Sequence, residues 1–381
     1  MNVPAVAGGD VAVTVFLCGD VMPARGVDQI LPCPGDPALR EPAVDDARTY
    51  VALAEKANGP IPRPVDFSWP WGAAIPVLEA EAPDVRLLNL ETSVTAGGEF
   101  ALDKQLHYRM SPGNLPVLTA VRPDACALAN NHVLDFGMAG LTDTLGFLDQ
   151  AGLRGLGAGY DVIEAKEPVI VPVDGSRRVV VFAAGMASSG APRRWAATGD
   201  RPGVSFVHGL SGRSAAEVSR RVLEFKRPGD IGIVSLHWGT NWGYRVDPGQ
   251  VRFAHRLIDA GVDVVYGHSS HHPRPIELYR NRLILYGCGD AINDYEGIPG
   301  HDYYRDDLRL LYFASFSSDS GELVSLRMLP VQARKMRLEH PEDRNVEWLR
   351  SRLDRVCRPF GVRVRREPSG MLHLDQDRLP H

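Results

Sequence analysis

The run VAVTVFLCGD (residues 11–20) is the stretch that decides the fold of this chain. Apolar and β-branched residues follow one another without a break up to Gly19 and Asp20. An uninterrupted run of this kind is typical of a strand that is buried on both faces of a sheet. A carboxylate such as Asp20 is costly to bury at a strand end without a cation or hydrogen-bond donors. The stretch therefore predicts a buried strand that leads into a polar site.

The same arrangement recurs along the chain, where further apolar runs end in polar residues. These runs are VRLLNLE (85–91), PDACALANNH (123–132), DIGIVSLHWG (230–239) and VDVVYGHSSHH (262–272). Segments with helical leucine spacing, such as AGLTDTLGFLDQA (139–151), lie between them. Strands that alternate with helices indicate an α/β fold, in which ligands bind beyond the carboxyl ends of the strands. We therefore expect the polar residues to converge on one site.

The length of the chain alone would permit two domains, but large α/β enzymes often form one. The 381 residues of this chain, of which 44% are hydrophobic, suffice for an extensive buried core, and we assign residues 1–330 to one domain. Residues 31–70 are rich in proline, glycine and charge, and we expect an insertion or lid with little regular structure. Residues 331–381 are expected to form a C-terminal extension, a helix followed by a strand pair, that packs on the domain.

The overall charge and the N-terminus bear on partners and location. Charged residues make up 23% of the chain and the formal net charge is -5, which gives no indication of nucleic-acid binding. The N-terminus lacks the features of a signal peptide, and no apolar run reaches the roughly 20 residues that a membrane span needs. The five cysteines form no Cys-x-x-Cys pair, which favours free thiols in a reducing compartment. We expect a cytoplasmic protein without nucleic acid or membrane as partner; the oligomeric state stays open.

Oxygen-bearing side chains at the strand ends are candidate metal ligands. Asp20 and Glu91 each follow a buried strand, and the amide of Asn131 follows another. Taken singly, Asp20 and Glu91 are each better explained as a cap or a salt-bridge partner, whereas for Asn131 we place the functional interpretation ahead of a turn. Together they favour a hard divalent cation, because such ions prefer carboxylate and amide oxygens. His237 closes a further apolar strand, although a lone histidine in that position is more often structural.

Histidines near carboxylates are candidates for acid–base catalysis. His132 is followed three residues later by Asp135, which could fix the imidazole tautomer and raise its basicity. A turn held by side-chain hydrogen bonds is the alternative. We place the catalytic interpretation of this pair ahead.

The segment GHSSHH (267–272) has the densest group of histidines, which packing explains poorly. His268 and His271 could act as metal ligand and as acid or base, in either order. Asp290 or Asp294, in a nearby acidic loop, could hold one of these histidines by a charge-assisted hydrogen bond. A solvated turn explains that loop equally well.

Two further groups are candidates for substrate binding. Lys104 or Arg109 could clamp a carboxylate or phosphate, although a surface strand would explain the same run. Trp238 and Trp242 follow His237 and could form an aromatic wall near the site, although tryptophan is also common in cores.

Six segments carry a resemblance to a known family. They are GDVMPAR (19–25), NLETS (89–93), ANNHVLDFGMAGLTDTL (129–145), LHWG (236–239), LIDAGVDVVYGHSSHHPRPIE (257–277) and YGCGDAIND (286–294). In this order they resemble the CapA-like group of capsule and poly-gamma-glutamate biosynthesis proteins, within the calcineurin-like metallophosphoesterase superfamily. The resemblance spans about residues 12–316 and leaves 31–70 and the tail beyond 330 unexplained.

The resemblance implies a calcineurin-like four-layer α/β/β/α sandwich with two mixed β-sheets and a metal centre at the strand ends. It matches ligand positions with Asp20, Glu91, Asn131, His237 and His271, and the acid/base position with His132. We also keep His268 as a ligand, with His271 then acting as acid or base.

Two departures from the superfamily pattern bear on the metal. Met22 replaces the histidine of the usual Asp-x-His motif, and Ser269 replaces a histidine of the usual His-x-His motif. Two nitrogen ligands of a dinuclear centre are therefore missing, which favours one oxygen-liganded divalent ion, Ca, Mg or Mn. We expect no organic cofactor.

The resemblance also suggests a reaction. A branch of the group is similar to metal-dependent peptide epimerases of lasso-peptide pathways, and epimerisation requires one base on each face of the α-carbon. His132 with Asp135, and His271 with Asp290 or Asp294, could be the two pairs, and a peptide or another carboxylate-bearing molecule would be the substrate. The alternatives are a metal-dependent phosphoester hydrolase and a protein of poly-gamma-glutamate synthesis or assembly.

Overall fold

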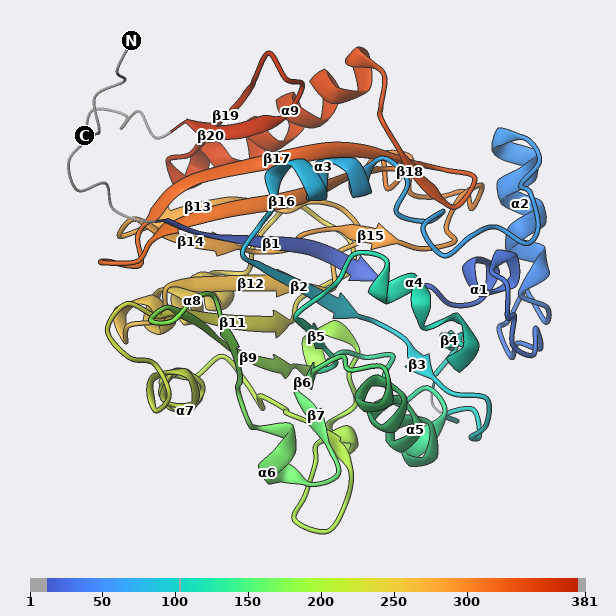
Figure 1. Cartoon of the computed structure of the whole chain (residues 1–381), viewed down its shortest axis with the longest axis horizontal. Helices are drawn as coiled ribbons and strands as arrows, with labels where there is room; N and C mark the ends of the chain where they lie inside the picture. The colour runs from blue at the N-terminus through green and yellow to red at the C-terminus, as the bar shows by residue number, and fades with distance from the viewer. Residues whose placement is uncertain (1–11, 103, 376–381) are drawn as a thin grey trace.

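The computed structural model describes residues 12–102 and 104–375 (Figure 1). Within this part of the chain, the larger of two principal sheets has the strand order β19-β20-β17-β16-β1-β2-β5-β6, with β15 beside β1 and β18 beside β17. Its strands are β1 (Ala12–Val21), β2 (Val85–Leu90), β5 (Ala125–Ala127), β6 (Gly155–Leu156), β15 (Asp290–Ile292), β16 (Leu308–Ser317), β17 (Leu323–Arg334), β18 (Arg337–Glu339), β19 (Arg363–Arg366) and β20 (Leu372–Asp375).

The second sheet has the order β13-β14-β12-β11-β9-β8. Its strands are β8 (Val169–Pro172), β9 (Arg178–Gly185), β11 (Ile231–His237), β12 (Val264–His268), β13 (Ile276–Tyr279) and β14 (Arg282–Leu285). Two short pairs complete the described strands: β3 (Ser93–Val94) with β4 (Arg109–Met110), and β7 (Ala158–Gly159) with β10 (Gly203–Val204). Both sheets are mixed, since β1 runs parallel to β2 but antiparallel to β16, and β9 runs parallel to β11 but antiparallel to β8.

Helices cover the outer faces of the two sheets (Figure 1). The helices are α1 (Gly26–Ile30), α2 (Arg48–Asn58), α3 (Ala74–Glu81), α4 (Pro116–Thr119), α5 (Gly137–Gln150), α6 (Val162–Ala165), α7 (Gly212–Leu223), α8 (Pro248–Asp259) and α9 (Asp343–Cys357). Helices α7 and α8 contact β9, β11 and β12, whereas α3 and α9 lie along the larger sheet. The predicted α/β architecture of two mixed sheets with flanking helices is confirmed.

The alternation of side chains along β9 explains this layering. Val179, Val181 and Ala183 belong to the core between the sheets, whereas the intervening residues belong to a second core shared with α7 and α8. Successive side chains of a strand point to opposite faces, so an uninterrupted apolar run needs a partner layer on each side. The apolar runs of the sequence therefore require both the facing sheet and the outer helices.

A tyrosine joins the two sheets next to the end of β1. Tyr266, on β12, is buried, and its hydroxyl is hydrogen-bonded to both main-chain groups of Cys18 on β1. The register of β1 with β2 is interrupted between Leu17 and Asp20, so Cys18 lies where this ladder breaks. The hydroxyl therefore supplies hydrogen bonds to the strand at a break in its ladder.

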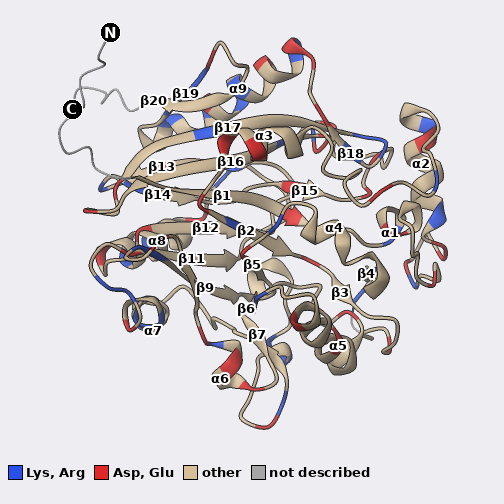
Figure 2. Cartoon of the chain, in the orientation of Figure 1, with Lys and Arg blue, Asp and Glu red and all other residues tan. Residues whose placement is uncertain are grey.

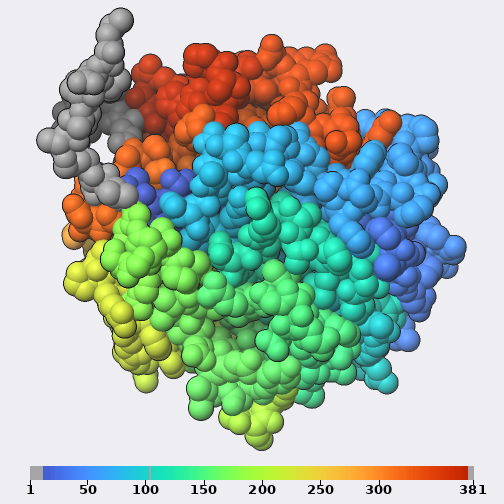
Figure 3. All heavy atoms as spheres, in the orientation of Figure 1, coloured from blue at the N-terminus to red at the C-terminus, as the bar shows by residue number. Residues whose placement is uncertain are grey.

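The segment 31–70 is more regular than expected. Helix α2 occupies 11 of its residues and buries Tyr50, Val51 and Ala54. The expectation of little regular structure was therefore wrong, because the proline- and glycine-rich flanks obscured a short amphipathic helix. The segment also contacts the C-terminal extension: the indole Nε1 of Trp69 donates to the carbonyl of Lys335 at 3.0 Å. The two segments lie against each other on the face seen in Figure 3.

The C-terminal extension adds strands to the larger sheet. Strand β20 pairs with β17 and β19 pairs with β20, while α9 buries Val346, Leu349 and Leu353. The division at residue 330 falls within β17, so the boundary between domain and extension stays a prediction. In the described part of the chain, none of the helices has the length and apolarity that crossing a bilayer requires. Acidic and basic residues are interspersed over the elements (Figure 2).

The end of β1 makes an unusually close approach to the chain before β15. A Cβ added at Gly19 would lie 1.8 Å from the main-chain oxygen of Gly289, which also accepts a hydrogen bond of 2.9 Å from the amide of Asp20. Replacing Gly19 with alanine should therefore destabilise the protein by at least the roughly 1–3 kcal/mol typical of overpacked cores. Denaturant unfolding measures this change.

Gly175→Ala is the matched control, since a Cβ added there meets nothing within 4 Å. It should leave the unfolding free energy nearly unchanged. A Gly19→Ala protein as stable as the Gly175→Ala protein would contradict the described approach of the two segments.

Candidate active site

The carboxyl ends of strands from both sheets bring the candidate residues together. Asp20 is the penultimate residue of β1, and its register neighbours are Asn89 on β2 and Asp290, the first residue of β15. In the second sheet His237 on β11 is the register neighbour of His268 on β12. The strands that carry these residues run toward the same side of the molecule (Figure 1). The register of both sheets therefore fixes the positions of the polar side chains.

Two overlapping groups of side chains could each hold a cation. Asp20, His271 and Asp290 form one group, and Asp20, Glu91 and His237 form the other; within each group the ligand atoms lie within 4.8 Å of one another. Because Asp20 belongs to both groups, the two positions adjoin. The preference for a single ion stays a prediction.

The residues of these groups fit a divalent cation. Asp20, Glu91 and Asp290 are all buried, and in the described part of the chain Oε2 of Glu91 and Nδ1 of His237 have no hydrogen-bond partner. Buried polar atoms without partners are rare in folded proteins and require an explanation. Oδ1 of Asn131 lies 2.7 Å from Nε2 of His237, so that an amide oxygen and an imidazole nitrogen meet at the same place. Carboxylate and amide oxygens suit Mg and Mn, whereas carboxylate and imidazole suit Zn.

The pKa values of the adjacent carboxylates Asp20 and Glu91 shift in opposite directions. Burial raises the pKa of Glu91 well above its usual value, and the charge of Asp20 adds to this effect. Burial would also raise the pKa of Asp20, but the imidazoles of His268 and His237 hold it below its usual value. Without a cation one carboxylate of the pair is therefore ionised and the other favours its proton. A bound cation would favour the ionised form of both.

His268 lies beneath Asp20. Its Nδ1 is 3.6 Å from Oδ1 of Asp20, and its Nε2 lies 3.0 Å from the hydroxyl of Ser235. It is outside both three-residue donor groups, and it is fully enclosed by the protein. The geometry favours a role in orienting Asp20 and leaves the ligand position to His271, as the resemblance implied.

His132 is held by a carboxylate and an aromatic ring. Its Nδ1 lies 2.5 Å from Oδ2 of Asp135, whose Oδ1 lies 2.6 Å from Nζ of Lys104. The ring of Tyr108 stacks on the imidazole with 3.9 Å between centroids. Burial lowers the pKa of His132 to about 4, despite the opposing charge of Asp135. The imidazole is therefore neutral near pH 7 and able to accept a proton at Nε2, which points toward Glu91 at 3.8 Å.

His271 has the opposite electrostatic character. Its Nδ1 lies 3.0 Å from Oδ1 of Asp290, and Asn293 donates to the other oxygen of that carboxylate at 2.6 Å. Burial lowers the pKa of His271, but the charge and hydrogen bond of Asp290 outweigh this effect, so that the net shift is upward. Asp290 rather than Asp294 is therefore the carboxylate that holds His271.

A cavity of about 250 Å³ opens above these histidines. Its lining comes from widely separated segments of the chain: Arg25, Tyr50, Leu106, Tyr108, His132, Asn241, Trp242, His271, Tyr295, Ile298, His301 and Asp306. Tyr50 comes from α2, so the segment 31–70 contributes a wall of the cavity. Whether this segment moves as a lid stays open.

Several predicted residues lie elsewhere than expected. Asp294 pairs with Arg25, accepting hydrogen bonds from its Nε at 3.1 Å and from the amide of Gly26 at 2.9 Å. Lys104 is engaged with Asp135 and His132 rather than open to substrate. Arg109 donates to the carbonyl of Asp36 at 3.1 Å and does not line the cavity.

The two tryptophans predicted to form an aromatic wall, Trp238 and Trp242, lie in different environments. Trp238 is fully buried against Phe253 and Tyr286, so the aromatic wall does not include it. Trp242 does line the cavity and stacks on His301 with ring centroids 3.7 Å apart. Nothing in the sequence distinguishes the core tryptophan from the one at the cavity wall.

Arg25, Tyr108, Tyr295 and Asp306 also line the cavity and were not predicted as site residues. Arg25 stood within the quoted segment GDVMPAR, so its position beside a predicted ligand was an available signal. The other three come from loops without any pattern that distinguishes them.

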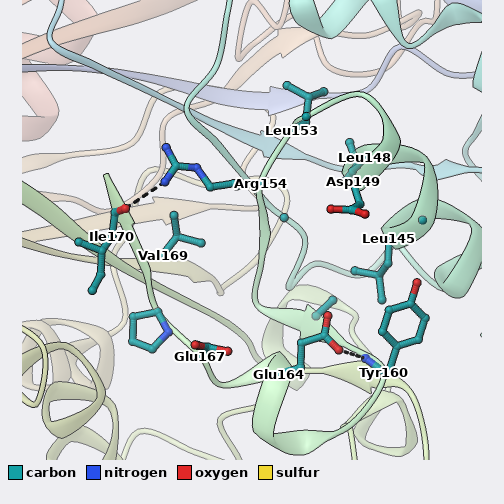
Figure 4. Close-up of a pocket in the computed structure, with 15 residues that line it drawn as sticks. Leu145, Leu148, Asp149, Leu153, Arg154, Tyr160, Glu164, Glu167, Val169 and Ile170 are labelled. Atoms are coloured by element: carbon teal, nitrogen blue, oxygen red, sulfur yellow. Dashed lines mark hydrogen bonds between the residues drawn. The ribbon is translucent and has the colours of Figure 1, made fainter. Parts of the chain in front are cut away.

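A larger cavity of about 690 Å³ lies away from the strand ends, between α5, α6 and β8 (Figure 4). It is lined by Leu145, Leu148, Tyr160, Glu164 and other residues, and none of the predicted site residues reaches it. Size alone does not identify the site, because the convergent polar groups surround the smaller cavity.

The family model of the bacterial capsule synthesis protein PGA_cap matches residues 14–295 of this chain. The chain belongs to the PGA_cap family. The matched range contains the ends of β1, β2, β5, β11, β12 and β15, and with them every residue of the two donor groups. The predicted resemblance to the CapA-like group is thereby confirmed.

Proteins similar to this chain include some that are named for polymer synthesis. A "Probable polyglutamine synthesis accessory protein" of Mycobacterium tuberculosis is 55% identical over 370 residues, which cover 97% of each chain. The PGA biosynthesis protein CapA of Bacillus subtilis is 29% identical over 214 residues, covering 54% of this chain and 52% of CapA. A crystal structure of a phosphatase from Mycoplasma pneumoniae covers 89% of this chain and 98% of its own, with 9% identity and a TM-score of 0.47.

Replacing one member of the donor groups at a time should separate the two cation positions. Asp20→Asn should weaken divalent metal binding at both, because Asp20 is the shared ligand. Asp290→Asn should weaken only the position that includes His271. Elemental analysis and isothermal titration with Mn²⁺ give the stoichiometry and affinity of each protein.

Glu164→Gln is a suitable control, because Glu164 lines the larger, distant cavity. It should bind metal as the wild type does. Unchanged metal binding in Asp20→Asn would refute the assignment of these residues as ligands.

Proposed function

We propose that this protein is a metal-dependent hydrolase that acts in the synthesis of a glutamate or glutamine polymer. The family and the polymer-synthesis relatives support the biological role. The observation that carries the chemical proposal is the sharing of Asp20 by two cation-binding groups beside a neutral, carboxylate-held histidine, His132.

Each residue has a distinct part in this reaction. A divalent cation bound at Asp20 supplies Lewis-acid chemistry at the scissile group. His132 accepts a proton at Nε2 and returns it to the leaving group, while Asp135 keeps the other ring nitrogen protonated. Lys104 balances the buried charge of Asp135, so that the carboxylate orients the imidazole without needing a proton itself. His271, held by Asp290, contributes a ligand.

Metal-dependent turnover of generic phosphoesters tests the proposal. Purified protein supplied with Mn²⁺ or Mg²⁺ should hydrolyse p-nitrophenyl phosphate or its diester, and chelation should abolish the activity. Asp135→Asn should lower kcat by about 100-fold or more, since loss of the orienting carboxylate leaves the wrong tautomer.

Glu164→Gln again serves as the control and should keep the wild-type rate. Absence of turnover with each of several divalent metals, in protein shown to bind metal, would overturn the hydrolase proposal.

A second candidate, Cα epimerisation of a peptide residue, rests on one specific observation. His132 and His271 line the same cavity, each beside a carboxylate, and their pKa values shift in opposite directions. An imidazole with a lowered pKa and one with a raised pKa suit the base and the acid of a two-base epimerisation. The relatives favour the first proposal, and none of those named above points to a lasso-peptide substrate.

Deuterium incorporation distinguishes the two candidates. In D₂O with metal present, an epimerase should place deuterium at the α-carbon of a glutamate-containing peptide, whereas a hydrolase should not. His271→Asn should abolish inversion at the α-carbon, because one face would lack its acid, whereas His132 could still exchange the α-proton on its own face. Formation of the epimer at equal rates in wild type and His271→Asn would exclude a two-histidine mechanism.

A further inference from the structure

The basic group at the cavity is already fully engaged. Arg25 donates from Nε and Nη2 to Asp294, and from Nη1 to Glu41 at 2.8 Å and to the hydroxyl of Tyr50 at 3.1 Å. Its one positive charge faces two carboxylates that lie in contact with it. Arg25 therefore holds the segment 31–70 against the loop after β15 and has no nitrogen left for an anionic ligand.

The tyrosine hydroxyls of the cavity are engaged as well. Tyr50 donates its hydroxyl hydrogen to Glu41. The hydroxyls of Tyr108 and Tyr295 lie 2.5 Å apart and share a hydrogen bond. The phenol groups that could have received a substrate carboxylate are thus directed toward other protein groups.

Asp306 differs from these residues. It is partly buried and lines both this cavity and an adjacent one of about 430 Å³. Within residues 12–102 and 104–375 its carboxylate is hydrogen-bonded only to its own main-chain N–H and has no ion-pair partner in contact with it. It lies close enough to His271 for its charge to contribute to the raised pKa of that imidazole.

Burial raises the pKa of Asp306, and the nearby charge of Arg309 opposes this shift without contacting the carboxylate. Arg309 donates from Nε to the main-chain oxygen of Asp306 at 3.4 Å, from Nη1 to the main-chain oxygen of Ala291 at 2.7 Å, and from Nη2 to Asn293. Arg305 is engaged with Asp307 at 2.7 Å. Asp306 is consequently an acceptor with a charge and a free face at the wall of the cavity.

We propose that Asp306 binds a protonated amino group of the substrate at the outer end of the cavity. An ammonium group offers three hydrogen-bond donors and no acceptor. It therefore complements the carboxylate of Asp306, because the neighbouring arginines already donate to other protein groups. A substrate carboxylate in that place would meet Asp306 without a free guanidinium to balance it. The site therefore takes the amino-terminal end of an amino-acid polymer rather than its carboxyl end. The role of Asp306 rests on the proposed function, because that function defines where the reacting group of the substrate lies.

Two probes that differ only in the amino group test the assignment. γ-Glutamylglutamate carries the ammonium group, and glutarylglutamate is the same molecule without it. Isothermal titration of the metal-loaded, full-length protein should show that the amine probe binds about tenfold more tightly, as expected for one partly exposed charge-assisted hydrogen bond. Asp306→Asn should reduce this preference to nearly one, with unchanged metal content and thermal stability.

Asp302→Asn is the matched control, because Asp302 lines the adjacent cavity but not this one. It should keep the tenfold preference. Equal affinity of the wild type for both probes, failure of both to bind, or a preference that survives in Asp306→Asn would each overturn the assignment.

The result is separable from the hydrolase proposal. Hydrolysis of an amine-free phosphoester reports on the metal and His132 alone. Turnover without amine preference would refute only the role of Asp306, whereas amine preference without turnover would refute only the hydrolase proposal.

Discussion

The mutual repulsion of three buried carboxylates is the constraint on which the site depends. Asp20, Glu91 and Asp290 are brought together by strand register, where water is excluded. Like charges in such a place require a proton, a cation or hydrogen-bond donors. The structure shows a share of each: Glu91 has a raised pKa, imidazoles surround Asp20, and Asn293 donates to Asp290. A divalent cation at either of the two adjoining positions would satisfy Asp20 together with one of the other two carboxylates.

The same constraint explains the arrangement around the site. The side chains that surround the carboxylates are themselves held by a further layer, in which Ser235 holds His268 and Asp135 holds His132. Residues anchored in this way keep their rotamers when a ligand arrives, which is the preorganisation that catalysis requires. The segment 31–70 joins this layer through Glu41 and Tyr50, so a part of the chain outside the sheets completes the cavity wall.

The sequence was sufficient to predict the strands and the residues at their ends. A buried strand has a long apolar run, and a polar residue after it stands out, so Asp20, Glu91, Asn131 and His237 were identifiable. The choice between Asp290 and Asp294 was not, because it depends on a register that places Asp290 beside Asp20 and on a loop that turns Asp294 toward Arg25. Lys104 and Trp238 were misplaced for a related reason: which way a loop side chain points depends on partners far away in the chain. Helix α2 was missed because its apolar face is short and proline surrounds it.

The hydroxyl of Tyr266 has a mechanical consequence for the two sheets. It reaches from β12 to both main-chain groups of Cys18, two residues before Asp20, where the ladder between β1 and β2 is interrupted. Sliding one sheet over the other would break these bonds and leave the polar groups of Cys18 without partners in an apolar interior. These hydrogen bonds therefore fix the two sheets to each other next to the cation-binding residues. Breathing motions of the sheets are expected to be largest at the opposite end, near the start of β1.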